Sequence, residues 1–380
     1  MPIGLLKLGA LYKSRGWDVR LVCGNTLLYD FEPQHILVTS LFTYWSRYVA
    51  DAALYYHAMF PHAKLIVGGI FASLLPDVCK RMTGADQVFV GIHEEAERFE
   101  PDYGLLDEEL DYEILHSSRG CVRRCGFCYT WKIEPEFYAL RALSERIHKN
   151  RVVLYDNNFL ANPFVEDLLD DLAKARVNGR PVQYECQSGF DGRLLTPFLA
   201  QKLKRAHFVY PRIAWDGPIS DCENIRTQLG MLIDAGYQSK SISVFMLYNW
   251  DIPFKQMELK RLKVWEWKVQ ITDCRFRPVT QLYDHFDARK PRGSDAYFIH
   301  GAWTDDQIKQ FRRNVRRQNI CVRHGIPFHS SVLERKSLPR HEFGPLKRAS
   351  RDTVIARLPD AWFPDDSSTR SGDENHAPKA

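Results

Sequence analysis

The sequence lacks several features that would indicate a membrane, secreted or nucleic-acid-binding protein. It has no run of about eighteen apolar residues, so no transmembrane helix is expected. Its N-terminus has neither a positively charged segment nor a small-residue cleavage site, which excludes a typical signal peptide. Neither charge dominates, because 52 basic and 47 acidic residues leave a net charge of only +5. The odd count of nine cysteines argues against a disulfide framework. These absences predict a protein of the reducing cytoplasm.

A second Cys-x-x-Cys pair is also absent, although three cysteines are clustered. Cys121, Cys125 and Cys128 stand at spacings of four and three, with Gly120 before them. Such a loop can direct three thiolates at one centre, and thiolates select zinc or iron–sulfur clusters. Because a structural zinc site usually takes four ligands from two separated pairs, three ligands favour an iron–sulfur cluster with one open iron. The alternatives are a zinc loop that borrows His116 or a distant cysteine, and three incidental thiols.

The motif Cys-x3-Cys-x2-Cys, with Phe127 before its last cysteine, resembles that of the radical S-adenosylmethionine (SAM) enzymes. The resemblance implies that Cys121, Cys125 and Cys128 are catalytic ligands of a [4Fe-4S] cluster and that Phe127 lies beside the adenine of SAM. In that family SAM chelates the open iron, and its one-electron reductive cleavage gives a 5′-deoxyadenosyl radical that abstracts hydrogen from a substrate. A one-electron donor such as flavodoxin or ferredoxin is therefore an implied partner, whereas the substrate is not implied.

Residues 1–100 alternate helices and strands in the pattern of a doubly wound parallel sheet. We expect strands over 18–22, 35–42, 64–69 and 87–90, and helices over 3–15, 46–60 and 75–82. With Gly68-Gly69 and Gly91-Ile-His-Glu94-Glu95, this pattern resembles the cobalamin-binding-like (B12-binding) domain that precedes many radical SAM cores. That fold opens on a strand, but this chain opens on a helix. We therefore expect a truncated Rossmann-like domain, a remnant or one whose start is internal to an ancestral gene, with exposed strand edges.

Cobalamin itself is an open question for this domain. No Asp-x-His-x-x-Gly motif occurs, which excludes a histidine ligand below cobalt that is supplied in that way. Related enzymes hold cobalamin without such a ligand. Cobalamin therefore stays a candidate cofactor, and a vestigial scaffold is the alternative.

Residues 101–300 are predicted to form the radical SAM core, a partial (β/α)6 TIM-like barrel that follows an acidic connector over 101–116. We expect strands over 114–117, 151–155, 182–186, 210–215, 241–247 and 275–278. The helices between them are expected to end near 149 and 179, to begin at 196, and to cover 220–236 and 253–267. In such barrels the chemistry lies at the C-terminal ends of the strands. Polar residues follow the predicted strands at these ends: Asp156, Asn157, Asn158, Gln187, Ser188, Asp216, Asn249 and Arg277.

The resemblance gives several of these residues a role in cofactor binding. Segment 156–158 stands where the family has a Gly-Gly-Glu-like segment that binds the SAM amino group, although both glycines are missing here. Asp216 and Gln187 are expected to hold the ribose hydroxyls or the methionine carboxylate, and a carboxylate suits two hydroxyls. Asn249 completes the predicted set. Asparagine and glycine are also common in turns, and Asp191 can cap one, so a structural role is the alternative for each.

The C-terminal part divides into a predicted helical extension over 301–363 and a polar, disordered tail over 364–380. Thr304 and Gln307 predict a capping box at the start of a helix over 304–318. Four arginines share one face of this helix: Arg312, Arg313, Arg316 and Arg317. A solvated basic face is the simpler interpretation. An RNA-binding face is the alternative, and the absence of interleaved aromatic residues weakens it.

The sequence as a whole predicts a radical SAM enzyme that acts on an unknown substrate. The first alternative keeps the fold and makes the protein a cobalamin-dependent radical SAM methyltransferase. The second alternative is a non-catalytic iron–sulfur or zinc module that binds RNA.

Overall fold

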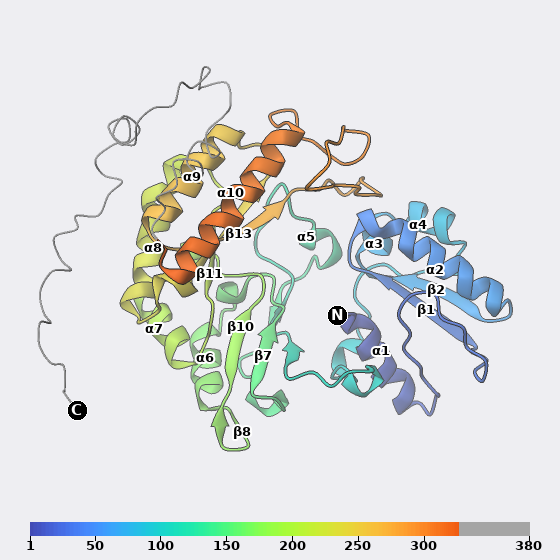
Figure 1. The fold of residues 1–380 in the computed structure, drawn as a ribbon. Helices are drawn as coiled ribbons and strands as arrows, with labels where there is room; N and C mark the ends of the chain where they lie inside the picture. Colours follow the sequence, from blue (N-terminus) through green and yellow to red (C-terminus); the bar gives the residue numbers. More distant parts are fainter. Residues whose placement is uncertain (327–380) are drawn as a thin grey trace, which may run out of the picture. The chain divides into compact units, whose positions relative to one another are not determined.

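The computed structural model of the chain describes residues 1–326. The predicted extension beyond residue 326 and the predicted tail at 364–380 lie outside the described residues. The described part is a mixed α/β fold of parallel strands with helices between them (Figure 1). None of its helices combines the length and the apolar composition that a membrane span requires.

The N-terminal part contains a three-stranded parallel sheet in the order β1-β2-β3. Its strands are β1 (His35–Ser40), β2 (Lys64–Gly68) and β3 (Gln87–Val88), and its helices are α1 (Ile3–Ser14), α2 (Ser46–Met59), α3 (Gly69–Leu74) and α4 (Pro76–Thr83). Leu65, Val67 and Phe71 are fully buried between the sheet and its helices. Each such side chain contributes about 1.5–3 kcal/mol to folding. The parallel sheet agrees with the predicted pattern of alternating helices and strands.

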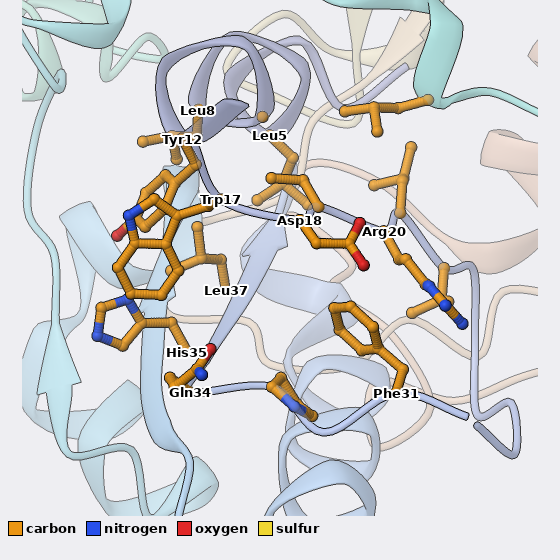
Figure 2. Close-up of a pocket in the computed structure, with 16 residues that line it drawn as sticks. Leu5, Leu8, Tyr12, Trp17, Asp18, Arg20, Phe31, Gln34, His35 and Leu37 are labelled. Carbon is orange, nitrogen blue, oxygen red and sulfur yellow. The ribbon is translucent and has the colours of Figure 1, made fainter. Parts of the chain in front are cut away.

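The strand predicted over residues 18–22 does not form. In the described part of the chain β1 pairs with β2 alone, and residues 18–22 make no backbone hydrogen bonds to its free edge because a cavity separates them from it. A cavity of about 140 Å³ lies between this segment, α1 and β1. Figure 2 shows Leu5, Leu8 and Tyr12 of α1 around this cavity, opposite Leu37 of β1. Leu5, Leu8 and Tyr12 therefore face a cavity beside the open edge of β1, whereas Ile3 and Leu6 of the same helix pack against Ile114.

Six parallel strands follow in sequence order: β4 (Glu113–Leu115), β7 (Arg151–Leu154), β10 (Gln183–Cys186), β11 (Arg212–Ala214), β12 (Ser243–Tyr248) and β13 (Gln270–Arg275). They form two three-stranded sheets, β10-β7-β4 and β11-β12-β13. Isolated parallel bridges join Tyr184 to Phe208 and Phe190 to Ile213, and these link the region of β10 to that of β11. Within the described residues β4 and β13 are not paired, so the strands do not close into a barrel.

Helices α6 (Val165–Lys174), α7 (Pro197–Arg205), α8 (Cys222–Asp234), α9 (Phe254–Glu266) and α10 (Asp305–His324) connect or follow these strands. The short elements α5 (Thr130–Ile133), β5 (Ser118–Arg119) and β6 (Tyr138–Ala139) surround the cysteine motif. α6 buries Val165, Leu168 and Leu172 in the main core. Thr196 caps α7 through the Leu199 amide, as its Thr-Pro start indicates. Apolar periodicity thus explains α6, and a capped start explains where α7 begins.

The helix predicted to end near residue 179 ends at Lys174 instead. Residues Arg176–Val177 (β8) and Arg180–Pro181 (β9) form an antiparallel hairpin around Asn178 and Gly179. Both turn residues have positive φ, at 51° and 73°, and Asn-Gly is the pair that a two-residue hairpin favours. The sequence therefore contained a signal that the helix prediction overlooked.

Three other predicted boundaries also differ. The last strand covers Gln270–Arg275 rather than 275–278, because its register places Gln270 opposite Ser243 of β12. The helix predicted to end near 149 is only a 3-10 turn at Ser144–Arg146. The helix predicted over 220–236 covers Cys222–Asp234 and has no side-chain cap, although Ser220 and Glu223 have the spacing of a capping box. The capping box of Thr304 and Gln307 is confirmed, and α10 continues to His324.

Candidate functional site

The cysteine motif lies on a loop between β5 and α5, just beyond the C-terminal end of β4. Gly120 fixes the start of this loop, because its φ is +77° and an added Cβ would lie 2.1 Å from the Glu136 carbonyl oxygen. Its amide donates to the Glu134 carboxylate at 2.7 Å. The second glycine, Gly126, has open space around its Cα. Of the two glycines at the motif, Gly120 is therefore the one whose backbone requires glycine.

The three thiols are free, partly exposed and close enough to interact. Burial raises the pKa of Cys125, and the nearby Asp216, Cys128 and Cys121 raise it further. The Cys121 sulfur accepts the Arg123 amide at 3.4 Å. Within residues 1–326, however, no group of three or more Cys, His, Asp or Glu side chains is placed to hold a metal ion. The donor set fits a thiolate-bound cluster, and the side chains would have to turn toward a common centre to form it.

The Asp156 carboxylate lies beneath the loop rather than at its surface. It is fully buried and accepts hydrogen bonds from the Ser117 amide at 3.0 Å and from the Ser117 and Ser118 hydroxyls at 2.6 Å. Burial raises the pKa of Asp156, and these hydrogen bonds oppose the shift. The carboxylate thus supports the turn that leads from β4 into the cysteine loop.

Asn157 connects the end of β7 to the two sides of the loop. Its amide nitrogen donates to the Glu134 carboxylate at 2.9 Å, and its oxygen accepts the Thr130 hydroxyl at 3.4 Å. Glu134 also pairs with Arg119 at 2.9 Å. Sequence reasoning missed Glu134, because its partners come from two other segments, residues 119–120 and Asn157.

Asn158 and Asp191 bring the ends of β7 and β10 to the same loop. Asp191 pairs with Arg123 of the cysteine loop at 2.9 Å and with Arg193 at 2.7 Å. Burial opposes ionisation of Asp191, but hydrogen bonds from the two guanidinium groups hold its pKa below the usual value. The Asn158 amide approaches Asp191 at 3.5 Å, while its own oxygen is buried without a partner. The Asn158 side-chain oxygen is thus a buried acceptor without a hydrogen bond beside the loop.

The remaining predicted site residues divide into exposed and buried ones. Asp216 and Gln187 are exposed at the ends of β11 and β10, and Phe127 is half-buried within the loop. Although Asp216 is accessible to solvent, the atoms packed around it partly desolvate its carboxylate and raise its pKa, against the Lys260 and Arg193 charges that lower it. Asn249 is fully buried and bonds to the Phe298 carbonyl and the His300 amide at 2.9 Å each. It holds the 298–300 segment and is not presented to the cysteine loop.

Two further strand-end residues predicted from the sequence take different positions. Arg277 pairs with Asp284 at 2.6 Å and lies over the Tyr44 ring at 4.5 Å. Ser188 is exposed in the turn after β10. The structure therefore gathers the ends of β7, β10 and β11 around the cysteine loop, whereas the residues after β12 and β13 have other partners.

A second cavity, of about 740 Å³, is lined in part by the residues that flank the loop, Arg119 and 132–136. Its lining includes Lys7, Glu97, His116, Arg119 and Glu134. Burial and then the Arg119 charge hold the pKa of His116 far below its usual range, so the imidazole is neutral. Its Nε2 atom lies 2.7 Å from the Arg119 guanidinium, so this nitrogen already has a hydrogen-bond partner. This contact gives no support to a zinc loop that borrows His116.

Comparisons with known proteins give a likeness in fold alone. No family model matches the chain, and no curated protein is similar to it in sequence. Among solved structures it is similar to the radical S-adenosylmethionine methyltransferase TsrM from Kitasatospora setae, with cobalamin and a [4Fe-4S] cluster bound. The TM-score is 0.52 at 12% identity, and the match covers 67% of this chain and 66% of that one. The chain thus matches just under two thirds of the length of that enzyme.

Proposed function

We propose that this protein is a radical SAM enzyme that reductively cleaves SAM at a [4Fe-4S] cluster and acts on a substrate not yet identified. One observation carries the proposal. The Cys121–Cys128 loop follows the first of six parallel strands, and the polar ends of the next strands surround it. A cluster with three protein ligands leaves one iron for the cofactor, and the strand ends are where barrel enzymes place their chemistry. The likeness to TsrM supports the fold that this requires.

In this proposal the chain supplies ligands, position and charge. Cys121, Cys125 and Cys128 would hold the cluster, which would supply the single electron for SAM cleavage when bound. Asp216 accepts hydrogen bonds from the SAM ribose in this proposal. Its carboxylate is exposed, and it lies near enough to Cys125 to raise the pKa of that thiol. Asn158 and Asp191 fix the loop from the side of β7 and β10. Phe127, Asn157 and Gln187 complete the proposed cofactor site.

The proposal includes the arrangement of the two parts. The six parallel strands form an open, partial (β/α)6 barrel, and residues 1–100 form a B12-binding-like domain before it. Gly69 supports the latter, because its φ is +86° and an added Cβ would lie 2.6 Å from the Ser40 carbonyl oxygen. This tight turn lies at the C-terminal edge of the β1-β2-β3 sheet, where doubly wound folds bind their ligands.

Cobalamin-dependent methyl transfer is a second candidate, favoured by one observation. TsrM has cobalamin bound, and its fold is similar to this chain. Purification in the presence of hydroxocobalamin separates the two candidates. Retained corrinoid, seen by its visible absorption after desalting, favours the methyltransferase. A corrinoid-free protein that still cleaves SAM favours the first candidate.

Anaerobic reconstitution with iron and sulfide tests the cluster directly. We expect about four irons and four sulfides per chain in the wild type, and severalfold less in Cys125→Ala. Cys23→Ala is the matched control, because Cys23 is an exposed cysteine outside the motif. A protein that takes up one zinc and no iron would contradict the proposal and favour the non-catalytic alternative. A flavodoxin or ferredoxin is the proposed electron donor.

A further inference from the structure

Lys260 is a buried cation that the proposed chemistry does not use directly. It lies in the middle of α9, and its side chain is 0% exposed. Its ammonium donates to the Trp215 and Gly217 carbonyls at 2.8 Å each, and it lies 4.8 Å from the centre of the Trp215 ring. Burial of a charge is unfavourable unless it gains such partners. The ammonium therefore holds the backbone on both sides of Asp216.

The turn around Lys260 is closely built. The Trp215 indole donates to the Pro218 carbonyl at 3.0 Å and stacks on Trp267 with 5.8 Å between the ring centres. An added Cβ on Gly217 would lie 1.9 Å from the Asp221 carboxylate. The backbone of 215–217 thus has little freedom while the ammonium is in place. The Asp216 side chain extends from this turn and lies near enough to Cys125 and Arg193 for their charges to interact.

We infer that Lys260 is a positioning residue for cofactor binding, which fixes the Asp216 carboxylate at the C-terminal end of β11 so that it can accept hydrogen bonds from SAM. The inference rests on the proposed function and adds a residue from an outer helix to it. Lys260 touches no cofactor itself, because backbone carbonyls and an indole ring surround its ammonium. It acts through Asp216, in the way that supporting residues orient the groups that contact a ligand.

The charge of Lys260 gives this role a pH signature. Burial lowers its pKa to about 7, against the Asp216 and Asp221 carboxylates, which raise it. The ammonium is therefore present below neutral pH and is lost as the pH rises through that value. Arg193 and Asp191 also face Asp216, and their charges shift the pKa of that carboxylate rather than the pKa of Lys260. SAM affinity that depends on Lys260 should fall between about pH 6 and pH 8.

The test compares Lys260→Met and Lys260→Arg in the reconstituted, unreduced protein. Equilibrium binding of SAM is measured from pH 6 to pH 8, with iron content and thermal unfolding beside it. Lys263→Met is the matched control, since Lys263 lies on the same helix in a partly exposed pair with Glu266. We expect Lys260→Met to bind SAM about tenfold more weakly at equal iron content, without the pH dependence. Lys260→Arg should restore affinity and also lose the pH dependence, because arginine stays charged.

Each other outcome has a defined meaning. Equal SAM affinity in Lys260→Met and the wild type would overturn the positioning role and leave the proposed function intact. A wild type that loads iron and binds no SAM would remove the proposed function, and this inference with it. If Lys260→Met does not fold, Lys260→Arg decides, because unchanged pH dependence in that variant would also overturn the inference.

Discussion

The Nε atom of Arg123 lies 2.9 Å from an oxygen of Asp191, and this ion pair fastens the cysteine loop to the end of β10. The carboxylate is only 7% exposed and also binds Arg193. The pair joins the loop to the parallel sheet without involving any of the three thiols.

Replacement of Asp191 by asparagine should therefore loosen the loop. The variant keeps the volume of the side chain but loses the charge that both arginines contact. We expect trypsin to cut severalfold faster at Arg123 or Arg124, and the reconstituted protein to lose iron faster. Glu185→Gln, which removes an ion pair between β10 and Arg212 of β11, is the control. Equal cleavage rates in the two variants would show that the pair does not order the loop.

Gly120→Ala should destabilise the start of the loop. The left-handed backbone alone costs about 1–2 kcal/mol for a residue with a Cβ, and the clash with the Glu136 carbonyl adds to it. Gly126→Ala, in open space within the same motif, should change the free energy of unfolding by less than about 0.5 kcal/mol. Urea denaturation of both variants tests this difference. Equal midpoints would contradict the role assigned to Gly120.

Asp156→Ala should lower the free energy of unfolding by about 3 kcal/mol, because it leaves an amide and two hydroxyls without their acceptor. Asp156→Asn keeps the shape and should have a much smaller effect. Because burial raises the pKa of Asp156 in the folded state, its stabilising contribution is full below the unfolded value of about 4 and falls as the pH rises through the folded value. The stability of the wild type relative to Asp156→Asn should therefore decrease with rising pH. A difference that increases with pH would contradict this sign.

A buried ion pair on α9, which is also hydrogen-bonded to α10, provides a test of the C-terminal packing. Glu258 and Arg261 lie 2.9 Å apart, and the arginine also binds Gln318 of α10. Arg261→Met leaves the buried Glu258 carboxylate without its ion-pair partner and should lower the free energy of unfolding by about 3–5 kcal/mol. Adding Glu258→Leu should recover most of this loss, because no unpaired charge then remains. Thermal unfolding of the single and double variants measures the coupling, and strictly additive losses would argue against it.

The parts of the molecule that were predictable from sequence depend on local chemistry. The cysteine spacing, the Thr196-Pro197 helix start and the Thr304 capping box are contained within a few residues each, and the structure contains the two helix starts as expected. The Asn178-Gly179 hairpin was equally local and was overlooked. Alternation of helices and strands also predicted the parallel pairing of the sheets.

The rest depends on partners that are distant in sequence. Residues 18–22 have the composition of a strand, but within residues 1–326 they lie across a cavity from the free edge of β1 and do not pair with it. Asp156 and Asn249 have the sequence positions of site residues, yet both are buried by their hydrogen-bond partners. Lys260 is one of many lysines, and only the fold shows that its ammonium lies beneath Asp216. Tertiary contacts, rather than propensity, decide these positions.

Release of 5′-deoxyadenosine from SAM tests the central claim most directly. The protein is purified without oxygen, reconstituted with iron and sulfide, and treated with a strong one-electron reductant, with Cys125→Ala as the control. We expect release by the wild type and none by the variant, and then the substrate is the question that follows. A cluster-loaded wild type that binds SAM and releases no 5′-deoxyadenosine, with or without candidate substrates, would contradict the radical SAM assignment.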